Sequence, residues 1–400
     1  MKKAEEYRRW LEGRYVEERA AAFPHLGLNA SAGRYYDASQ QDFFKDIPAE
    51  FQPLIAFQQD VRLGQVTLSQ ALFTWGQVGA AIRGAKWALA TGDDQLRRFQ
   101  QAVRRDVTAA FYDVLLAKEF EAITAQTVEQ RQRHLDETQK RHALGTATDY
   151  DVLSAEVALA NARPDAISAA NAVRTARERL RFLLAEEDDV DATGVLEAEV
   201  APPPRYEDVL ADAFAHRPEL ATSDHTRRAQ MELVKINGAY DRPRLDLQGA
   251  YGVKNVEVFD QSSRGKTWNL GLVLSFPFFD GLKTRAKVAQ ARSDVRTTEL
   301  AEKQLRDGIA LEVRLAVDQA AKSAEIVRAL SSTVAQAERL LTMAEKGYEF
   351  GVKTKLEVDD AQLNLRTARG NLASAQRDYR VALTNLDWVA GTLGETPTGS

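Results

Sequence analysis

The chain has 400 residues, of which 28% are charged and 8% are aromatic, and its formal net charge is −5. This acidic balance, with no basic stripe interleaved with aromatic residues, argues against a nucleic-acid-binding protein. Because the sequence contains no cysteine, disulfides, thiolate metal sites and cysteine nucleophiles are excluded. No run of about 18 apolar residues is present, so no transmembrane helix is expected.

The first half of the chain is predicted to fold as helix, strand, strand, long helix and returning helix. The opening helix (3–22) starts with lysines but lacks the apolar segment of a signal peptide. Strands are expected at about 25–36 and 61–70, where apolar and small polar residues alternate. A proline-free helix then runs over 75–143, roughly 100 Å, and a helix over 149–185 returns.

The second half repeats this order after a linker over 186–216. We therefore divide the chain into a first structural repeat over 1–185 and a second over 217–391. The predicted elements of the second repeat are an opening helix (219–238), strands at about 244–258 and 267–277, a long helix (281–346), a returning helix (355–390) and, after the repeat, a tail (392–400).

An internal duplication supports this division. Gly145 matches Gly351, and Arg163 matches Arg369, at a constant separation of 206 residues. Between its two strands the first repeat has about thirteen extra residues, around DASQQDFFKDIPAEFQP, as expected of a loop insertion. The counterpart of Arg217 would precede Met1. We therefore expect that the chain starts inside its first repeat and that the natural N-terminus, with a signal peptide, has been removed.

The predicted strands have one apolar face and one small or polar face. Nine or ten such residues fit a membrane-spanning strand, although an antiparallel sheet of a soluble protein has the same pattern. The number of strands favours the membrane, because four strands cannot close alone and an open edge is not viable in lipid. The residues predicted to face lipid are Leu245, Leu247, Tyr251, Trp268, Leu270, Leu272 and Leu274.

Four features occur together and in order along the chain. They are LSFPFFDG before a long helix, KGYEFGVKTKLEVDDAQ near the second helical turn, RPEL before a repeat, and the duplication itself. In this combination the chain resembles the TolC-type outer-membrane efflux proteins. The resemblance implies a mainly α fold with a membrane β-barrel portion. In this fold a homotrimer builds one twelve-stranded β-barrel that continues into a twelve-helix α-barrel, girdled by an equatorial region at 186–216.

The resemblance implies a passive exit duct of a tripartite efflux or type I secretion system, gated at its periplasmic tip. Such a duct lies in the bacterial outer membrane and extends into the periplasm. The expected partners are a periplasmic adaptor (membrane fusion) protein, an inner-membrane pump and outer-membrane lipid. The alternative hypothesis is a soluble helical coiled-coil scaffold or tether with a small sheet.

The joint between barrel and helix is predicted at Pro277, Asp280 and Gly281. Proline cannot donate a hydrogen bond, so Pro277 is expected to end the strand ladder. Asp280 and Gly281 then offer a cap and a flexible joint before the helix. The first repeat differs, since Ala71 stands in place of Pro277 and 74–76 in place of 280–282.

The resemblance assigns the periplasmic tip to the two helical turns. The residues expected to contact an adaptor are Gly145, Thr146, Gly351 and Val352. The position of Asp151, Tyr348 and Lys353 matches a gate-locking network, in which an arginine is common in place of Lys353. A lysine lacks the bidentate fork of arginine, so any lock through it should be looser.

Glu357 and Asp360 match two acidic positions that narrow the entrance in the family. Their spacing of three places both on one helix face. Threefold symmetry would then make a ring of six carboxylates that favours cations, with some pKa values raised by mutual repulsion. The alternative is that both acids open a helix, where the dipole favours them.

No catalytic constellation is predicted. The sequence has no Gly-rich phosphate loop, zinc pattern or serine elbow. Of the five histidines, His134 and His142 share a helix face without further ligand spacing. We therefore expect no enzyme activity, no cofactor and no metal site.

Overall fold

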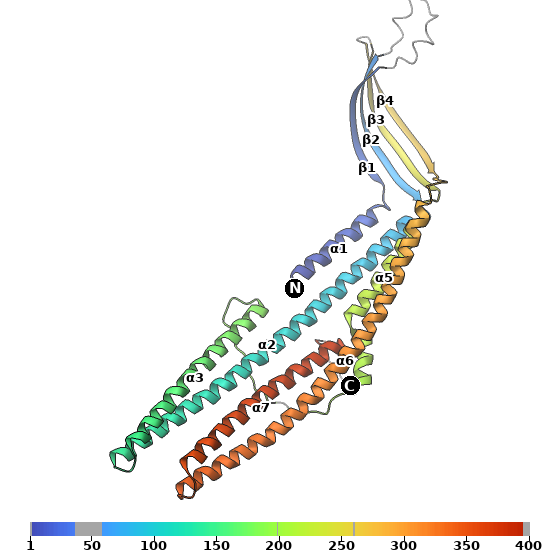
Figure 1. The fold of residues 1–400 in the computed structure, drawn as a ribbon. Coiled ribbons are helices and arrows are strands. Elements are labelled where there is room, and N and C mark those ends of the chain that lie inside the picture. The colour runs from blue at the N-terminus through green and yellow to red at the C-terminus, as the bar shows by residue number, and fades with distance from the viewer. Residues whose placement is uncertain (1, 37–57, 198, 259–260, 395–400) are drawn as a thin grey trace, which may run out of the picture. The chain divides into compact units, whose positions relative to one another are not determined.

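The computed structural model describes residues 2–36, 58–197, 199–258 and 261–394. The predicted loop insertion falls in residues 37–57, outside the described part of the chain. No helix within the described ranges is both long and apolar enough to cross a membrane. The elements, in chain order, are α1 (Lys2–Ala20), β1 (His25–Tyr36), β2 (Gln58–Phe73), α2 (Gln77–Ala143), α3 (Asp149–Leu184), α4 (Tyr206–His216), α5 (Pro218–Asn237), β3 (Arg244–Val258), β4 (Gln261–Ser275), α6 (Lys283–Glu349) and α7 (Lys355–Ala390) (Figure 1).

The helices of the two repeats have equal lengths. α2 and α6 each contain 67 residues, and α3 and α7 each contain 36. A helix of this length spans about 100 Å, as the absence of proline predicts. The predicted linker contains a helix, because α4 occupies its last third.

The chain forms two compact units that do not coincide with the two repeats. The first, which we call the sheet unit, comprises residues 2–94 and 221–302, and the second, the hairpin unit, comprises 95–220 and 303–394. The sheet unit holds the strands, α1, α5 and the first parts of α2 and α6. The hairpin unit holds α3, α4, α7 and the remainder of the two long helices.

The sheet unit contains an antiparallel sheet in the order β1-β2-β3-β4. Its register places Leu26 opposite Leu68 and Tyr251 opposite Trp268, so apolar side chains of neighbouring strands share one face. β2 extends further than predicted at both ends, and β4 begins earlier, at Gln261. Within the described residues β1 and β4 are each paired on one side only.

The face predicted to contact lipid is uncovered in the chain. Trp268 is 73% exposed and Leu274 is 70% exposed, and Tyr251, Leu270 and Leu272 are also exposed. Leu245 and Leu247 are half-buried, because their strand has neighbours on both sides. A contiguous exposed apolar surface of this kind marks a contact with a membrane or a partner.

The two joints between strand and helix have the same backbone conformation. Trp75 and Gly76 have φ of 49° and 76°, and Gly281 and Leu282 have φ of 66° and 68°. Two successive residues in the left-handed region turn the chain sharply. The joints therefore bend alike although their sequences differ.

An equivalent side chain caps the helix that follows each joint. The Val78 amide donates to Thr74 Oγ1 at 3.3 Å, and the Thr284 amide donates to Asp280 Oδ2 at 2.8 Å. Threonine and aspartate are both good acceptors for the unpaired amides of a first helical turn. The predicted cap at Asp280 is thus present, and Thr74 is its counterpart in the first repeat.

Pro277 does not itself end the strand ladder, contrary to the prediction. The last ladder pair joins Arg244 to Ser275, two residues before the proline. The Phe278 amide donates to the Phe276 carbonyl at 3.0 Å, so the chain is already turning on both sides of Pro277. In the first repeat β2 continues to Phe73 through a bulge.

In the hairpin unit α2 packs against α3, and α6 packs against α7, through matched residues. The first contact centres on Leu135, Ala155 and Leu159, and the second includes Val358 and Ala361. Alanine and valine at these sites let the helices approach closely. The duplication therefore preserves the core of each hairpin.

Pro164 and Gly370 stand at matched positions of the two repeats but have different roles. α3 continues through Pro164 without a break. A Cβ on Gly370 would lie 3.1 Å from the ring of Phe120 on α2. The glycine therefore makes room for an aromatic contact between α7 and α2.

A buried arginine joins three helices near α4. The side chain of Arg217 is 5% exposed and donates to Glu312 at 2.5 Å and to Glu219 at 3.3 Å. Its guanidinium also lies 5.6 Å from the centre of the Trp388 ring. Burying a cation is favourable only when its donors are satisfied in this way.

We predict that Arg217→Met destabilises the hairpin unit by about 2 kcal/mol, less than the ~3–5 kcal/mol of a fully buried pair, because Glu312 is half-exposed. Thermal unfolding in detergent measures the effect. The control is Arg369→Met, whose pair with Glu338 at 2.9 Å is exposed on both sides. Equal melting temperatures of the two variants would contradict the prediction.

Candidate functional site

The two turns that end α2 and α6 have the same geometry. Gly145 and Gly351 both have φ of +74°. The Thr146 amide donates to the Arg141 carbonyl at 2.8 Å, and the Val352 amide donates to the Gly347 carbonyl at 2.9 Å. This is the Schellman arrangement, which requires a left-handed residue and therefore favours glycine. A Cβ on either glycine would meet no atom within 4 Å, so the surface beside each turn is open.

A capping box starts the helix after each turn. The Asp151 amide donates to Thr148 Oγ1 at 3.2 Å, and the Thr148 amide donates back to Asp151 Oδ2 at 2.8 Å. In the second repeat Thr354 and Glu357 make the same reciprocal pair, at 3.3 Å and 2.8 Å. Asp151 and Glu357 therefore have an assured structural role in fixing the turns.

Exposed apolar side chains surround both turns, and of these only Val352 was expected to contact an adaptor. Leu144 is 79% exposed and its counterpart Phe350 is 80% exposed. Tyr150 is 78% exposed and its counterpart Leu356 is 69% exposed. The two members of each pair are 206 residues apart, which is the repeat distance. A comparison of the two repeats could therefore have identified these residues from the sequence. Two matched apolar rims of this kind are suited to binding a partner.

The carboxylate of Glu357 is fully engaged within its own chain. It accepts a hydrogen bond from Lys353 at 2.6 Å and from the Thr354 amide and hydroxyl. These contacts, with Lys353 first, lower the pKa of Glu357 from 4.5 to about 2. In the single chain, hydrogen bonds and a cation thus favour the charged form of Glu357, whereas the expectation of raised pKa values concerns the carboxylate ring of a trimer.

The residues of the predicted gate network are near the turns but do not bond to one another. Lys353 forms an ion pair with Glu357. The aliphatic part of its side chain packs over Gly347, and a Cβ added to this glycine would lie only 2.4 Å from Lys353 Cγ. Asp151 is held by its capping box, and its pKa is lowered chiefly by the Thr148 amide and hydroxyl. Tyr348 instead accepts a hydrogen bond from a residue that the sequence did not single out.

That residue is Arg141, which donates to the Tyr348 hydroxyl at 3.2 Å and thereby joins α2 to α6. A second link joins α2 to α7, since Arg131 donates to Asp359 at 2.7 Å. Both groups of this ion pair are about one-quarter to one-third exposed. Neither Arg131 nor Arg141 has an arginine at the matched position of the other repeat. The internal duplication therefore could not point to these two residues.

Asp360 lies beside this second link. It lines a small cavity of about 240 Å³ with Arg131 and Asp359. Arginines from the next turns of α7, Arg366 and Arg369, line the same cavity. Within one chain the two predicted ring carboxylates therefore have different surroundings.

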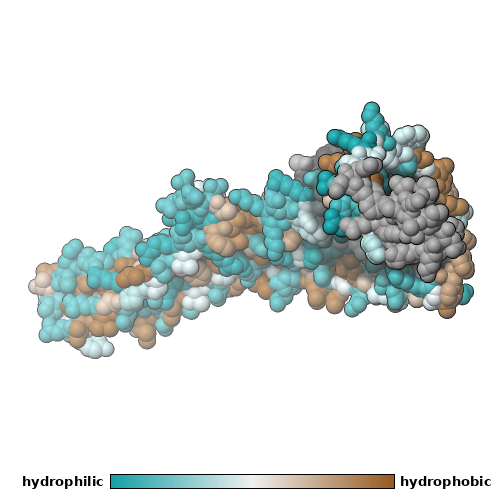
Figure 2. Space-filling model, turned by 90° about the horizontal axis from the view of Figure 1, so that it is seen from above, coloured by the Kyte–Doolittle hydropathy of each residue, from teal (hydrophilic) through white to brown (hydrophobic). Residues whose placement is uncertain are grey.

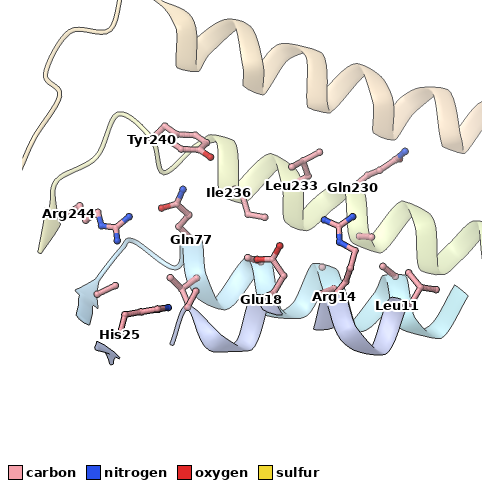
Figure 3. A pocket seen from close by; sticks show the side chains of 18 of the residues that line it. Leu11, Arg14, Glu18, His25, Gln77, Gln230, Leu233, Ile236, Tyr240 and Arg244 are labelled. Atoms are coloured by element: carbon pink, nitrogen blue, oxygen red, sulfur yellow. The ribbon is translucent and has the colours of Figure 1, made fainter. Parts of the chain in front are cut away.

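The polar face of the sheet unit has a larger cavity, of about 1080 Å³. Its strand residues include His25, Ser69 and Arg244, which alternate with the apolar residues of the opposite face. Figure 3 shows the side chains of Arg14 and Glu18 on α1 pointing toward α5 across this cavity. The cavity thus combines an apolar floor with a few charged groups.

The histidines do not gather into a site. His142 lies 2.8 Å from Asp149 across the first turn. Burial lowers the pKa of His134, and the charge of Lys355 lowers it further. Within the ranges that the structure describes, no three His, Asp or Glu side chains are grouped so that they could hold a metal ion.

Solved structures with the same fold are outer-membrane channels. The Campylobacter jejuni CmeC channel aligns over 100% of this chain and 84% of its own, with a TM-score of 0.80 and 15% identity. The open state of the Neisseria gonorrhoeae MtrE channel aligns over 100% of this chain and 87% of its own, with a TM-score of 0.79 and 19% identity. These likenesses show the fold of a TolC-type channel subunit.

Sequence relatives agree with the fold. The chain is 29% identical to the alkaline protease secretion protein AprF of Pseudomonas aeruginosa, over 94% of this chain and 78% of that protein. It is 23% identical to the outer membrane protein TolC of Escherichia coli, over 95% of this chain and 76% of that protein. The family model described as "Outer membrane efflux protein" matches residues 1–186 and 209–392. The chain therefore belongs to the outer membrane efflux protein family, whose members are conduits of the outer membrane and not enzymes.

Proposed function

We propose that three copies of this chain close one barrel and form an exit duct for efflux or type I secretion. The observation that carries the proposal is a sheet whose outer strands, in the described part of the chain, are each paired on one side only, and whose apolar face is uncovered. In lipid every backbone amide and carbonyl needs a partner, so β1 of one copy must pair with β4 of the next. Symmetric pairing of this kind closes into a ring.

Exposed apolar residues on the helices support the same assembly. On α3, Leu153 is 61% exposed and Ile167 is 70% exposed, and on α6, Leu311 is 60% exposed and Met343 is 70% exposed. Figure 2 shows hydrophobic residues, in brown, at the surface among hydrophilic ones along the helices. A single-chain scaffold would leave these residues in water, whereas a neighbouring copy covers them.

Cysteine cross-linking tests the trimer, because these 400 residues contain no cysteine. We predict that Asn29→Cys on β1, combined in turn with Asn269→Cys or Gly271→Cys on β4, gives a covalent species of three chains after oxidation. A disulfide needs Cα atoms about 5.5–6 Å apart, so one register should be favoured. Denaturing gel electrophoresis measures the product, and Asn29→Cys alone is the control. An open-ended ladder, or no product at any register, would contradict a closed trimer.

The two glycine turns form the docking surface for the periplasmic adaptor in this proposal. Their open surroundings and matched apolar rims support a protein contact there. Behind the rims, Arg141 and Arg131 tie the hairpin of α2 and α3 to the hairpin of α6 and α7. Docking that separates the hairpins has to break these links, which makes them a gate.

We predict that Arg131→Ala raises the conductance of single channels in planar bilayers, because one link between the hairpins is lost. The matched control is Arg369→Ala, which removes an ion pair with Glu338 inside one hairpin at nearly the same distance. The exchange Arg131→Asp with Asp359→Arg should restore the low conductance. An equal rise in both single variants would assign the effect to general loosening of the helices.

Two substitutions separate the structural and electrostatic roles of Glu357. Glu357→Gln keeps the capping box, since glutamine also reaches back to the Thr354 amide, and Glu357→Ala removes it. We predict fast hydrogen exchange of the Thr354 amide in the alanine variant only. Because the pKa of Glu357 is lowered to about 2, its stabilising charge is present above its ordinary pKa and is lost only as the pH falls through about 2.

The carboxylate ring itself is tested with the same conservative change. Glu357→Gln with Asp360→Asn should lower the preference for cations over anions, measured as the reversal potential in a salt gradient. The turns stay intact in this pair, so a change reports charge alone. An unchanged reversal potential would remove these two residues from the selectivity site.

A further inference from the structure

Cations without carboxylate partners gather where α6 begins. The first turns of α6 contain Lys283, Arg285 and Lys287 and no acidic residue in the first turn. Arg292 and Arg296 follow on the same helix, and within the described residues none of these five side chains has an ion pair. The residues of α2 that match Lys283, Arg285 and Lys287 are Gln77, Gly79 and Ala81, whereas Lys86 matches Arg292, so the cations at the start of the helix are confined to the second repeat.

These cations divide between two faces of the helix. Arg285, Arg292 and Arg296 have the spacing of one helix face, whereas Lys283 and Lys287 lie about 200° away from Arg285. The Lys287 ammonium lies 4.9 Å from the centre of the Tyr240 ring. Tyr240 lines the cavity on the polar side of the sheet unit (Figure 3). The lysines therefore belong to the polar side, and the arginines to the other.

The arginine side of α6 has a groove of its own. It is shared with α5, has a volume of about 740 Å³, and is lined by Met231, Val234, Val295, Arg292 and Arg296. The α5 residues of this groove, Met231 and Val234, differ from those of the polar-side cavity, which include Leu233 and Ile236. The two depressions thus lie on different faces of α5.

The groove shares its side with the apolar face of the sheet. The strand residues of the polar-side cavity, such as Ser69 and Arg244, point away from the face of Leu274 and Trp268. The segment between β4 and α6 exposes three aromatic rings: Phe276 is 55%, Phe278 86% and Phe279 75% exposed. Aromatic rings at the end of a lipid-facing band mark the membrane–water interface.

We propose that Arg285, Arg292 and Arg296, with the adjoining groove, bind the anionic headgroups of phospholipids in the leaflet nearest the helices. Arg285 and Arg292 are roughly 10 Å apart along the helix, and the headgroup layer on each side of the bilayer is roughly 5–8 Å deep, so Arg285 is the arginine nearest the hydrocarbon. Guanidinium groups without internal partners match phosphate in charge and geometry. The continuity of aromatic rings and cations favours a lipid surface over an acidic protein.

The proposal rests on the membrane insertion of the sheet proposed above. The test uses the full protein in neutral detergent and titrates it with phosphatidylglycerol or with phosphatidylcholine of the same acyl chains. Native mass spectrometry counts the bound lipids. We expect a preference for phosphatidylglycerol that falls about twenty-five-fold in Arg285→Gln/Arg292→Gln, since each cation near an anionic surface contributes about fivefold.

The matched control is Lys283→Gln/Lys287→Gln, which removes two charges from the same helix on its polar side. It should keep the preference. No preference in the natural protein, an equal loss in both variants, or displacement of the lipid by millimolar inorganic phosphate would each overturn the proposal. If the protein conducts in bilayers but shows no preference for phosphatidylglycerol, only the proposed lipid binding by the arginines is overturned. If the protein does not insert into bilayers, the proposed exit duct is overturned as well.

Discussion

The unpaired backbone groups of β1 and β4 are the constraint on which the rest of the protein depends. Water can satisfy these groups, but hydrocarbon cannot. The apolar face of the sheet, with Trp268 and Leu274 exposed, belongs in hydrocarbon. Both conditions are met only when the sheet is completed by other strands and so closes into a barrel. A subunit of this design is consequently unfinished alone, and its exposed helical side chains follow from the same incompleteness.

The two repeats end and start their helices with similar residues. Both helix ends use a left-handed glycine, and both following helices start with a threonine capping box. Where the halves differ, the difference has a purpose in packing. Gly347 makes room for the stem of Lys353, whereas its counterpart Arg141 reaches across to Tyr348. Matched positions of the two repeats therefore share the same backbone structure but make different side-chain contacts.

The alternation of apolar residues and the alignment of the two repeats with each other were sufficient to predict the helices and strands. Strands β1 and β3 follow the alternation of side chains, and the equal long helices follow from the absence of proline. The contacts near the turns could not be predicted in this way. The pairs Arg131–Asp359 and Arg141–Tyr348 join residues 207 or more positions apart, and no pattern within one helix specifies its partner on another. The resemblance assigns Asp151 and Glu357 to a gate, but both form a capping box with the threonine three residues before them, and Glu357 also accepts from Lys353.

The matched but unequal rims of the two turns have a consequence for any partner that meets the tip of a trimer. In the proposed trimer, three chains would present six turns, in which a leucine and tyrosine edge alternates with a phenylalanine and leucine edge. Six identical binding proteins arranged in a ring would consequently contact two different binding surfaces in alternation. Occupancy should then proceed in two stages, with three tighter positions filled before three weaker ones, so that assembly is graded rather than all-or-none.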